Sequence, residues 1–285
     1  MSVMTKYRGD ESACASRFVT SADGTVVSYF TVGNGPAAIV VPGVLSTATD
    51  YASFVEALGE SHTVHTIERR GRGVSGPQGD GYGIAKECED IAALQRETKA
   101  TFLVGHSYGG LIALEAARNN PAFAKLAVYE PGVSVDGSIA TAWMPAYKKS
   151  VAGKKYLDAL VTFSIGAGPE QARKMPHWLM KLMLPMFLRK HERQKMYGLL
   201  AANLLEHQEV ARNDGSYRNY RQVPARVLLM FGGKTRHKWV GQAITALSET
   251  LPSCEVREFP SLDHFGPDKG APREVARAVR SFFSE

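Results

Sequence analysis

A serine between two glycines is the strongest chemical signal in the sequence. Gly105-His106-Ser107-Tyr108-Gly109 fits the pattern G-x-S-x-G and stands between a short apolar run and a segment of helical period. A serine in a tight turn from strand to helix needs neighbours without side chains two positions away, which the two glycines supply. The turn predicts Ser107 as a nucleophile and the Tyr108 N–H as an oxyanion donor at a helix start. A glycine-rich turn with an inert serine is the alternative.

At this motif the chain resembles the α/β-hydrolase superfamily, and the resemblance covers nearly the whole sequence. Residues 40–44, Val-Val-Pro-Gly-Val, resemble the family's oxyanion loop, with Pro42 where many members have histidine. The resemblance implies Val44 as the second amide donor beside Tyr108, with Leu45 as the other candidate. A plain strand-ending Pro-Gly turn is the competing interpretation of this segment.

Residues 68–75, Glu-Arg-Arg-Gly-Arg-Gly-Val-Ser, resemble the family's Asp-x-Arg-Gly-x-Gly-x-Ser loop, with Glu68 in place of Asp. In the family this loop is structural. Residues 71–76 also fit the dinucleotide pattern G-x-G-x-x-G, but a Pro- and Gly-rich stretch follows where a helix should open. Without a helix N-terminus to hold a pyrophosphate, we do not expect a nucleotide site.

A serine nucleophile needs a histidine to accept its proton. In the family that histidine lies in the loop after the last strand and before the C-terminal helix, and His264 occupies this place. The other seven histidines fall in strands, in the turn around Ser107, in the inserted segment or in a surface loop. We therefore predict His264 as the general base, against the ordinary alternative of a structural histidine.

The carboxylate that would orient His264 departs from the common pattern. Most family members carry an Asp in the loop after the penultimate strand, but here that loop, 232–238, contains no carboxylate. A minority carries the acid at the end of the preceding strand, where Glu130 stands at the same sheet edge as Ser107. We predict Glu130 as the triad acid. A buried structural role for Glu130, a contribution from Asp136, and a Ser–His pair without an acid stay open.

The elements that must position these residues form an α/β pattern. Short apolar runs alternate with helical segments from residue 37 onward, which predicts a parallel sheet with helices on both faces. The first two runs flank an Asp-Gly turn and predict an antiparallel hairpin. The expected fold is a mostly parallel, eight-stranded α/β-hydrolase sheet. Its expected strands are 17–21, 26–32, 37–41, 63–67, 101–104, 126–129, 226–231 and 255–259.

The strand signal disappears between residues 133 and 223, where helical segments rich in Met, Trp and Phe take over. We interpret 133–223 as a helical cap inserted after the strand that ends at Glu130. The predicted α/β-hydrolase core then comprises 1–132 and 224–285.

The cap's large apolar side chains favour a hydrophobic small-molecule substrate. The predicted substrate-binding residues are Leu45, Trp143, Trp178 and Met183. The alternative is that most of these side chains close the cap's own core. The cap also carries much of the excess positive charge of a chain whose net charge is +6. These charges are either a solvated surface or a means of steering an anionic substrate or an acidic carrier protein.

Composition excludes several other classes. Neither a run of eighteen apolar residues nor a signal-peptide pattern is found, so we expect a cytoplasmic protein without membrane insertion. No dense basic stripe or DNA-reading motif suggests a nucleic-acid partner. The three cysteines, Cys14, Cys88 and Cys254, are isolated, which predicts free thiols rather than a disulfide framework or a metal site.

The residues together predict a serine hydrolase that cleaves an ester or lactone through an acyl-enzyme on Ser107, without metal or organic cofactor. Thioester hydrolysis, acyl transfer to an alcohol and carbon–carbon bond hydrolysis would use the same residues. Epoxide hydrolases and dehalogenases of this fold use an Asp nucleophile, so Ser107 disfavours both. A small-molecule binder or a protein that assists a cyclisation is the non-hydrolytic alternative, supported by the missing acid in 232–238.

Overall fold

The computed structural model of the protein describes residues 16–285, with an eight-stranded sheet at its centre. The strand order is β1-β2-β4-β3-β5-β6-β7-β8. The β1–β2 and β2–β4 pairs are antiparallel and all other pairs are parallel, so the predicted fold class is confirmed. The strands are β1 (Arg17–Thr20), β2 (Val26–Val32), β3 (Ala37–Val41), β4 (Thr63–Glu68), β5 (Phe102–His106), β6 (Lys125–Tyr129), β7 (Arg226–Gly232) and β8 (Cys254–Phe259).

The observed strands begin and end within two residues of their predicted limits. The largest difference is β5, which was expected to end at Val104 and continues to His106. The ladder explains the extension, because Gly105 pairs with Val41 of β3 on one side and His106 pairs with Tyr129 of β6 on the other. The strand therefore runs directly into Ser107, and pairing on both sides fixes the backbone that carries it.

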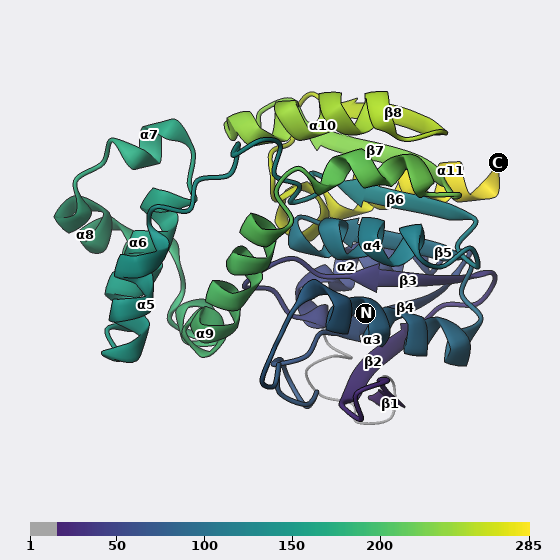
Figure 1. Cartoon of the computed structure of the whole chain (residues 1–285), viewed down its shortest axis with the longest axis horizontal. Helices are drawn as coiled ribbons and strands as arrows, with labels where there is room; N and C mark the ends of the chain where they lie inside the picture. Colours follow the sequence, from purple (N-terminus) through teal and green to yellow (C-terminus); the bar gives the residue numbers. More distant parts are fainter. Residues whose placement is uncertain (1–15) are drawn as a thin grey trace.

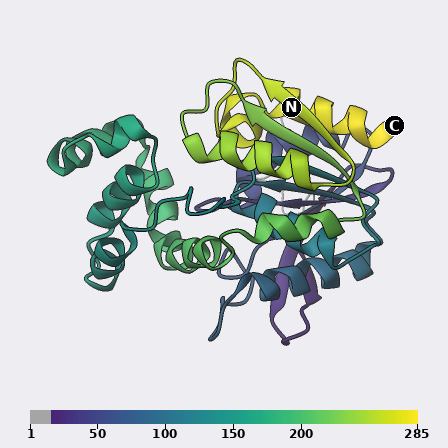
Figure 2. The same ribbon diagram turned by 45° about the horizontal axis from the view of Figure 1, so that its top comes forward.

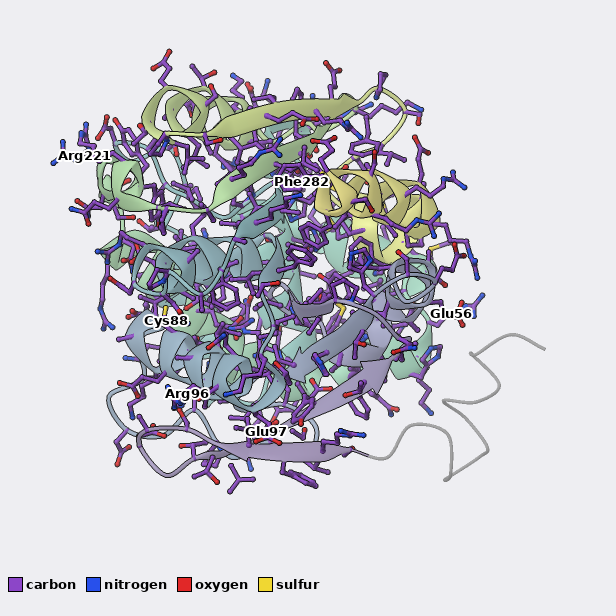
Figure 3. The ribbon with its side chains drawn as sticks, turned by 90° about the vertical axis from the view of Figure 1, so that its right-hand side faces the viewer. Glu56, Cys88, Arg96, Glu97, Arg221 and Phe282 are labelled. Atoms are coloured by element: carbon purple, nitrogen blue, oxygen red, sulfur yellow. The ribbon has the colours of Figure 1, made fainter. Side chains whose placement is uncertain are left out.

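Helices cover both faces of the sheet, as a parallel sheet requires. One face packs against α3, α4 and α10 and the other against α2 and α11 (Figure 1). Figure 3 labels Cys88 of α3, which packs against the apolar cluster on the first face, and Phe282 of α11, which belongs to the cluster on the second. These helices are α2 (Ala52–Leu58), α3 (Ile84–Thr98), α4 (Tyr108–Arg118), α10 (Lys238–Thr250) and α11 (Pro272–Ser284).

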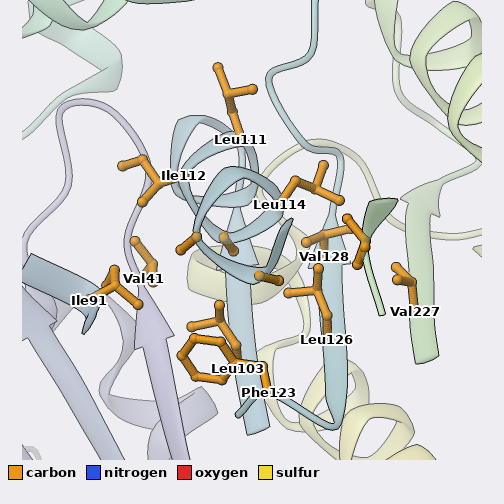
Figure 4. Close-up of a cluster of buried hydrophobic side chains, with 14 of the residues drawn as sticks. Val41, Ile91, Leu103, Leu111, Ile112, Leu114, Phe123, Leu126, Val128 and Val227 are labelled. Atoms are coloured by element: carbon orange, nitrogen blue, oxygen red, sulfur yellow. The ribbon is translucent and has the colours of Figure 1, made fainter. Parts of the chain in front are cut away.

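The helix that follows Ser107 is the most deeply buried one. All residues of α4 except Arg118 are buried, which is the behaviour of a helix that is apolar all round. Figure 4 shows Leu111, Ile112 and Leu114 of α4 among side chains from β3, β5, β6, β7 and α3. Each large side chain buried in this way contributes about 1.5 to 3 kcal/mol. This packing holds the start of α4, and with it the serine, in one place.

Five α-helices lie between β6 and β7 in the sequence, within the segment predicted as a cap. They stand to one side of the sheet in both ribbon views, with α9 leading back to the core (Figures 1 and 2). Their own apolar cluster includes Trp143, Tyr147 and Leu200, and Leu45 from the loop after β3 joins it. The helices are α5 (Met144–Ala152), α6 (Tyr156–Gly166), α7 (Glu170–Arg173), α8 (His177–Phe187) and α9 (Lys190–Arg212).

Two remaining expectations concern membranes and cysteines. Among the helices of residues 16–285, none combines the length and the apolar character needed to cross a bilayer. Cys88 and Cys254 are free thiols. The third cysteine, Cys14, lies outside the described residues.

The last residue of β4, Glu68, is buried with an incomplete set of hydrogen bonds. The Ala48 N–H donates to Oε2 at 3.2 Å, while Oε1 has no hydrogen-bond partner within residues 16–285. Burial raises the pKa of Glu68 to about 7, although the Ala48 N–H and the charge of Arg72 act in the opposite direction.

We therefore expect Glu68→Gln to remove the decrease in unfolding free energy that the buried carboxyl causes as pH rises. The folded-state pKa lies above the ordinary value of 4.5, so the folded state binds more protons between the two values and stability falls as pH rises through them. The loss amounts to about 1 to 3 kcal/mol. Urea unfolding should show the variant gaining this much on wild type between pH 5 and pH 8. An equal difference between variant and wild type at both pH values would contradict the prediction.

Candidate active site

The serine of the G-x-S-x-G motif sits in a strained turn between β5 and α4. Ser107 has φ 55° and ψ −123°, a region that residues with side chains rarely adopt. The two flanking glycines are required by close contacts. A Cβ at Gly105 would lie 2.4 Å from the Gly109 carbonyl oxygen, and one at Gly109 would lie 2.2 Å from the Val41 oxygen. The turn therefore tolerates only glycine at these two positions.

The structure brings the three predicted triad residues together. His264 Nε2 lies 3.2 Å from Ser107 Oγ, and His264 Nδ1 lies 2.7 Å from Glu130 Oε2. The three side chains come from the end of β5, the end of β6 and the loop after β8, which all lie at the carboxyl edge of the sheet. They form a continuous hydrogen-bonded chain with the order and spacing that nucleophilic catalysis requires.

Glu130 is fully buried at the end of β6 with a positive φ of 42°. Its Oε1 accepts hydrogen bonds from the Gly232 N–H at 2.9 Å and from the Thr235 hydroxyl at 2.6 Å, while Oε2 faces His264. The two donors on Oε1 match an ionised carboxylate, which only accepts hydrogen bonds. We infer from this network that His264 Nδ1 carries the proton, which leaves the Nε2 lone pair directed at Ser107.

The segment 232–238, which begins with the last residue of β7, holds the Glu130 carboxylate in place. It contains no carboxylate, yet it contributes both donors to Glu130 Oε1 through Gly232 and Thr235. The sequence analysis did not predict that Gly232 and Thr235 would donate hydrogen bonds to Glu130. Asp136 lies elsewhere, in an exposed ion pair with Arg218 at 3.0 Å.

The loop after β3 packs directly against the serine. A Cβ at Gly43 would lie 3.1 Å from Ser107 Cβ, and the Gly43 N–H donates to the Tyr51 hydroxyl at 3.1 Å. In the described part of the chain, neither the Val44 N–H nor the Tyr108 N–H has a hydrogen-bond partner. Tyr108 adjoins Ser107 in the chain and Val44 follows Gly43, so the turn and the loop offer two backbone donors for the predicted oxyanion hole.

The buried His106 ties this loop to the loop that carries His264. The Tyr51 hydroxyl donates to His106 Nδ1 at 2.6 Å, and His106 Nε2–H donates to the His264 carbonyl oxygen at 2.8 Å. Burial lowers the pKa of His106 well below its ordinary value, and the neighbouring His264 adds to the effect. His106 therefore stays neutral with its proton on Nε2, as this arrangement of donors and acceptors needs.

A sequence model of the alpha/beta hydrolase family matches residues 38–278, most of the chain. The chain belongs to this family. Among solved structures, an alpha/beta hydrolase from Sphaerobacter thermophilus is similar with a TM-score of 0.80 and 26% identity, covering 94% of this chain and 100% of that one. The enol-lactonase of Burkholderia xenovorans shares the fold with a TM-score of 0.72 and 16% identity, covering 94% and 100%.

Two relatives are similar in sequence over part of their length. The N-formylmaleamate deformylase of Pseudomonas putida is 35% identical over 123 residues, which is 41% of this chain and 46% of the relative. The pimeloyl-[acyl-carrier protein] methyl ester esterase of Xanthomonas campestris is 31% identical over 97 residues, 34% of this chain and 37% of the relative. The matched part thus spans less than half of each.

Aromatic rings surround His264 in this alpha/beta hydrolase. The rings of His237, Trp239 and Phe265 have centroids 5.7, 5.9 and 5.7 Å from that of His264. Sequence reasoning missed all three as neighbours of the site. Only Phe265 could have been found from the sequence, because it directly follows His264. His237 and Trp239 are distant from His264 in the sequence and come close to it only in the folded structure.

The predicted substrate-binding residues lie in different environments. Leu45 is buried beside the cap cluster, and Trp143 is packed inside that cluster with its Nε1–H bonded to the Ala140 oxygen. Trp178 is 68% exposed on α8, and Met183 is half-buried on the same helix. The structure thus assigns Trp143 to the cap's own core, the alternative raised above.

Within residues 16–285, no group of three or more His, Cys, Asp or Glu side chains is arranged to hold a metal ion. The polar groups at this edge of the sheet, among them Glu130, His106 and His264, are instead hydrogen-bonded to one another and to nearby backbone.

The contacts at the turn predict opposite effects for two glycine substitutions. Gly109→Ala would place its Cβ against backbone that cannot shift, so we expect a loss of about 3 kcal/mol or more in unfolding free energy. Gly241→Ala is the matched control, because Gly241 lies inside α10 and a Cβ added there would meet nothing within 4 Å.

For this control we expect a gain of about 0.5 to 1 kcal/mol. Urea denaturation of both variants checks the pair. A Gly109→Ala protein as stable as wild type would show that the turn can relax around a side chain.

Proposed function

We propose that this protein is a serine hydrolase that cleaves an ester or lactone of a hydrophobic small molecule through an acyl-enzyme on Ser107. The observation that supports the proposal most strongly is the hydrogen-bonded chain from Ser107 through His264 to Glu130, next to two unpartnered backbone N–H groups. Under this proposal Ser107 is the nucleophile, His264 the base and Glu130 the orienting acid, and the two N–H groups are the oxyanion donors.

In the acylation step, His264 Nε2 accepts the proton of Ser107 as Oγ attacks the carbonyl carbon of the substrate. The N–H groups of Tyr108 and Val44 donate to the oxygen that becomes negative, and Glu130 stabilises the imidazolium. When the intermediate collapses, His264 returns the proton to the leaving alcohol oxygen. The acyl group stays on Ser107.

Deacylation repeats these steps with water as the nucleophile. His264 accepts a proton from the water, whose oxygen attacks the acyl carbonyl carbon, and the same two amides hold the oxyanion. Ser107 Oγ leaves and takes the proton from Nε2, which releases the carboxylic acid and restores the resting state. Apart from the substrate and water, only Ser107 and His264 exchange protons in these steps.

The surroundings of the base support a hydrophobic substrate. The rings of Trp239 and Phe265 beside His264, and the buried Leu45 next to the oxyanion loop, offer apolar contacts to an acyl or alcohol group. The names of similar proteins add a methyl ester, an enol-lactone and an N-formyl amide to the substrates that should be screened. Thioesters and diketones belong in the same screen, since the same residues would act on them.

A carrier-bound acyl group is a second candidate substrate, favoured by charge. The cap segment 133–223 contains fourteen Lys and Arg against seven Asp and Glu, so it carries a net positive charge that the rest of the chain does not. Such a field attracts an acidic carrier protein and raises the rate of encounter. Under this proposal, kcat/KM for a carrier-bound ester exceeds that for the free ester and falls as salt is added.

Ser107→Ala should abolish labelling by a fluorophosphonate and lower kcat for p-nitrophenyl esters by about 10³- to 10⁶-fold, because the attacking oxygen is removed. The matched control is Ser248→Ala, whose exposed hydroxyl bonds only within its own helix. This control should label and turn over like wild type. Turnover near the wild-type level in Ser107→Ala would sink the mechanism.

Glu130→Gln should lower kcat by about 10²- to 10⁴-fold with little change in KM or stability. A glutamine can present its oxygen to Gly232 and Thr235, but its NH₂ group then faces His264 Nδ1 and favours the wrong tautomer. Asp136→Asn serves as the control, since Asp136 is exposed and paired with Arg218. Steady-state kinetics should show normal activity in the control; loss there, with full activity in Glu130→Gln, would reassign the acid.

A further inference from the structure

An arginine with no assigned role lies behind the oxyanion loop. Arg69 follows β4 and is fully buried. Its Nη1 donates to the carbonyl oxygens of Pro42 and Gly43, at 3.4 and 3.2 Å. These are the two residues that lead into Val44, so one guanidinium contacts two consecutive peptide groups of the loop.

Because a peptide group is planar, the contact between Arg69 and the Gly43 carbonyl also fixes the direction of the Val44 N–H. The Gly43 carbonyl and the Val44 N–H belong to one peptide, which is trans, as is every described peptide bond. In a trans peptide the C=O and N–H bonds point in opposite directions. A donor held on the Gly43 oxygen therefore turns the Val44 N–H away from Arg69 and leaves it without an internal partner.

The preceding peptide is held from both sides. Its carbonyl, on Pro42, accepts from Arg69, and its N–H, on Gly43, donates to the Tyr51 hydroxyl at 3.1 Å. The Gly43 N–H is thus already used and does not compete with Val44 as a donor. Both peptide planes of the loop have fixed orientations before any substrate binds, which is the preorganisation that oxyanion stabilisation depends on.

We propose that Arg69 is a positioning residue of the oxyanion hole, which sets the direction of the Val44 N–H through the two carbonyl groups behind it. The proposal rests on the proposed serine-hydrolase function. It adds a role for a residue in the loop that sequence analysis treated as purely structural.

Arg69 is itself held by a buried, charge-balanced network. Its Nε and Nη2 donate to Glu87 of α3 at 3.2 and 2.7 Å, and Nη2 also donates to Glu206 of α9 at 3.0 Å. Arg72 completes the network with a 2.7 Å ion pair to Glu206, and the Arg69 guanidinium lies 4.8 Å from the centre of the Tyr108 ring. Burial alone would lower the pKa of Arg69, but the two carboxylates outweigh it and raise that pKa well above its ordinary value.

One consequence concerns the inserted helices. Glu206 belongs to α9, which leads from the cap back to the core (Figure 1). The same guanidinium therefore contacts the oxyanion loop on one side and a cap helix on the other.

The neighbouring arginine provides a matched control. Arg70 is equally buried, pairs with Asp90 at 2.7 Å and Asp23 at 3.0 Å, and has no hydrogen bond to the loop after β3 in the described structure. Lysine keeps the positive charge in either place but lacks the planar fork that reaches carboxylates and carbonyls together. Arg69→Lys and Arg70→Lys should therefore both lose stability, while only the first disturbs the oxyanion loop.

The experiment compares both variants with wild type in urea unfolding, in kcat and KM for a p-nitrophenyl ester, and in inhibition by a trifluoromethyl ketone, whose adduct places an oxyanion in the hole. We expect Arg69→Lys to lower kcat about 10- to 100-fold with KM within about twofold, and to weaken the ketone by a similar factor. Arg70→Lys should keep wild-type values for all three kinetic quantities.

The outcomes separate this proposal from the proposed function. Normal kcat and ketone affinity in Arg69→Lys, or equal losses in both variants, would overturn the positioning role while the wild-type enzyme stays active. A wild-type protein that hydrolyses no ester and binds no ketone would overturn the function itself. If Arg69→Lys does not fold, the double variant Arg69→Met/Glu87→Gln takes its place, because it removes one charge of each sign and keeps the Glu206–Arg72 pair. The same losses in kcat and in ketone affinity are expected in it, and normal ketone affinity would overturn the proposal.

Discussion

The hydrogen bond between Glu130 Oε2 and His264 Nδ1 is the interaction on which the rest of the site depends. It joins the end of β6 to the loop after β8 and passes over β7, which lies between them in the sheet. Tyr129 pairs with Met230, so β6 ends beside the last residues of β7. Glu130 follows with a positive φ, and its side chain points into the site. With Glu130 at the end of β6, the segment 232–238 donates two hydrogen bonds to its carboxylate.

Of the six non-glycine residues with positive φ in residues 16–285, three lie where the chemistry is proposed. Leu45, Ser107 and Glu130 all have positive φ without being glycine, and each belongs to a different segment of the site. Such conformations cost of the order of 1 to 3 kcal/mol each and persist only where the surroundings enforce them. Here the enforcement comes from strand pairing on both sides of β5, from the buried helix α4, and from the network around Arg69.

The parts of the fold and site that sequence predicts are those encoded locally. Alternation of apolar runs and helices predicted the sheet, and the glycines around Ser107 predicted a strand-turn-helix that the structure contains. Glu130 was inferred from the absence of a carboxylate in 232–238, and the structure places it beside His264. The catalytic roles of these residues stay predictions, whereas the fold class and the family are established.

The parts that sequence could not give depend on contacts between distant segments. Thr235 donates to Glu130 across 105 positions, and Arg69 pairs with Glu206 across 137, distances at which no periodicity or motif carries information. Composition also cannot tell which way a helix faces. Trp143 and Trp178 are both large apolar residues of the inserted segment, yet one is buried in its core and the other is exposed.

The central claim is that Ser107 forms a covalent acyl intermediate, and rapid-quench mass spectrometry tests it most directly. The protein is mixed with a slowly turned-over p-nitrophenyl ester, quenched in acid within the first turnover, and analysed intact and after proteolysis. The account predicts a mass increase equal to the acyl group, located on the peptide that contains Ser107, and its disappearance in Ser107→Ala. Turnover of the ester without an adduct, or with an adduct on another residue, would contradict it.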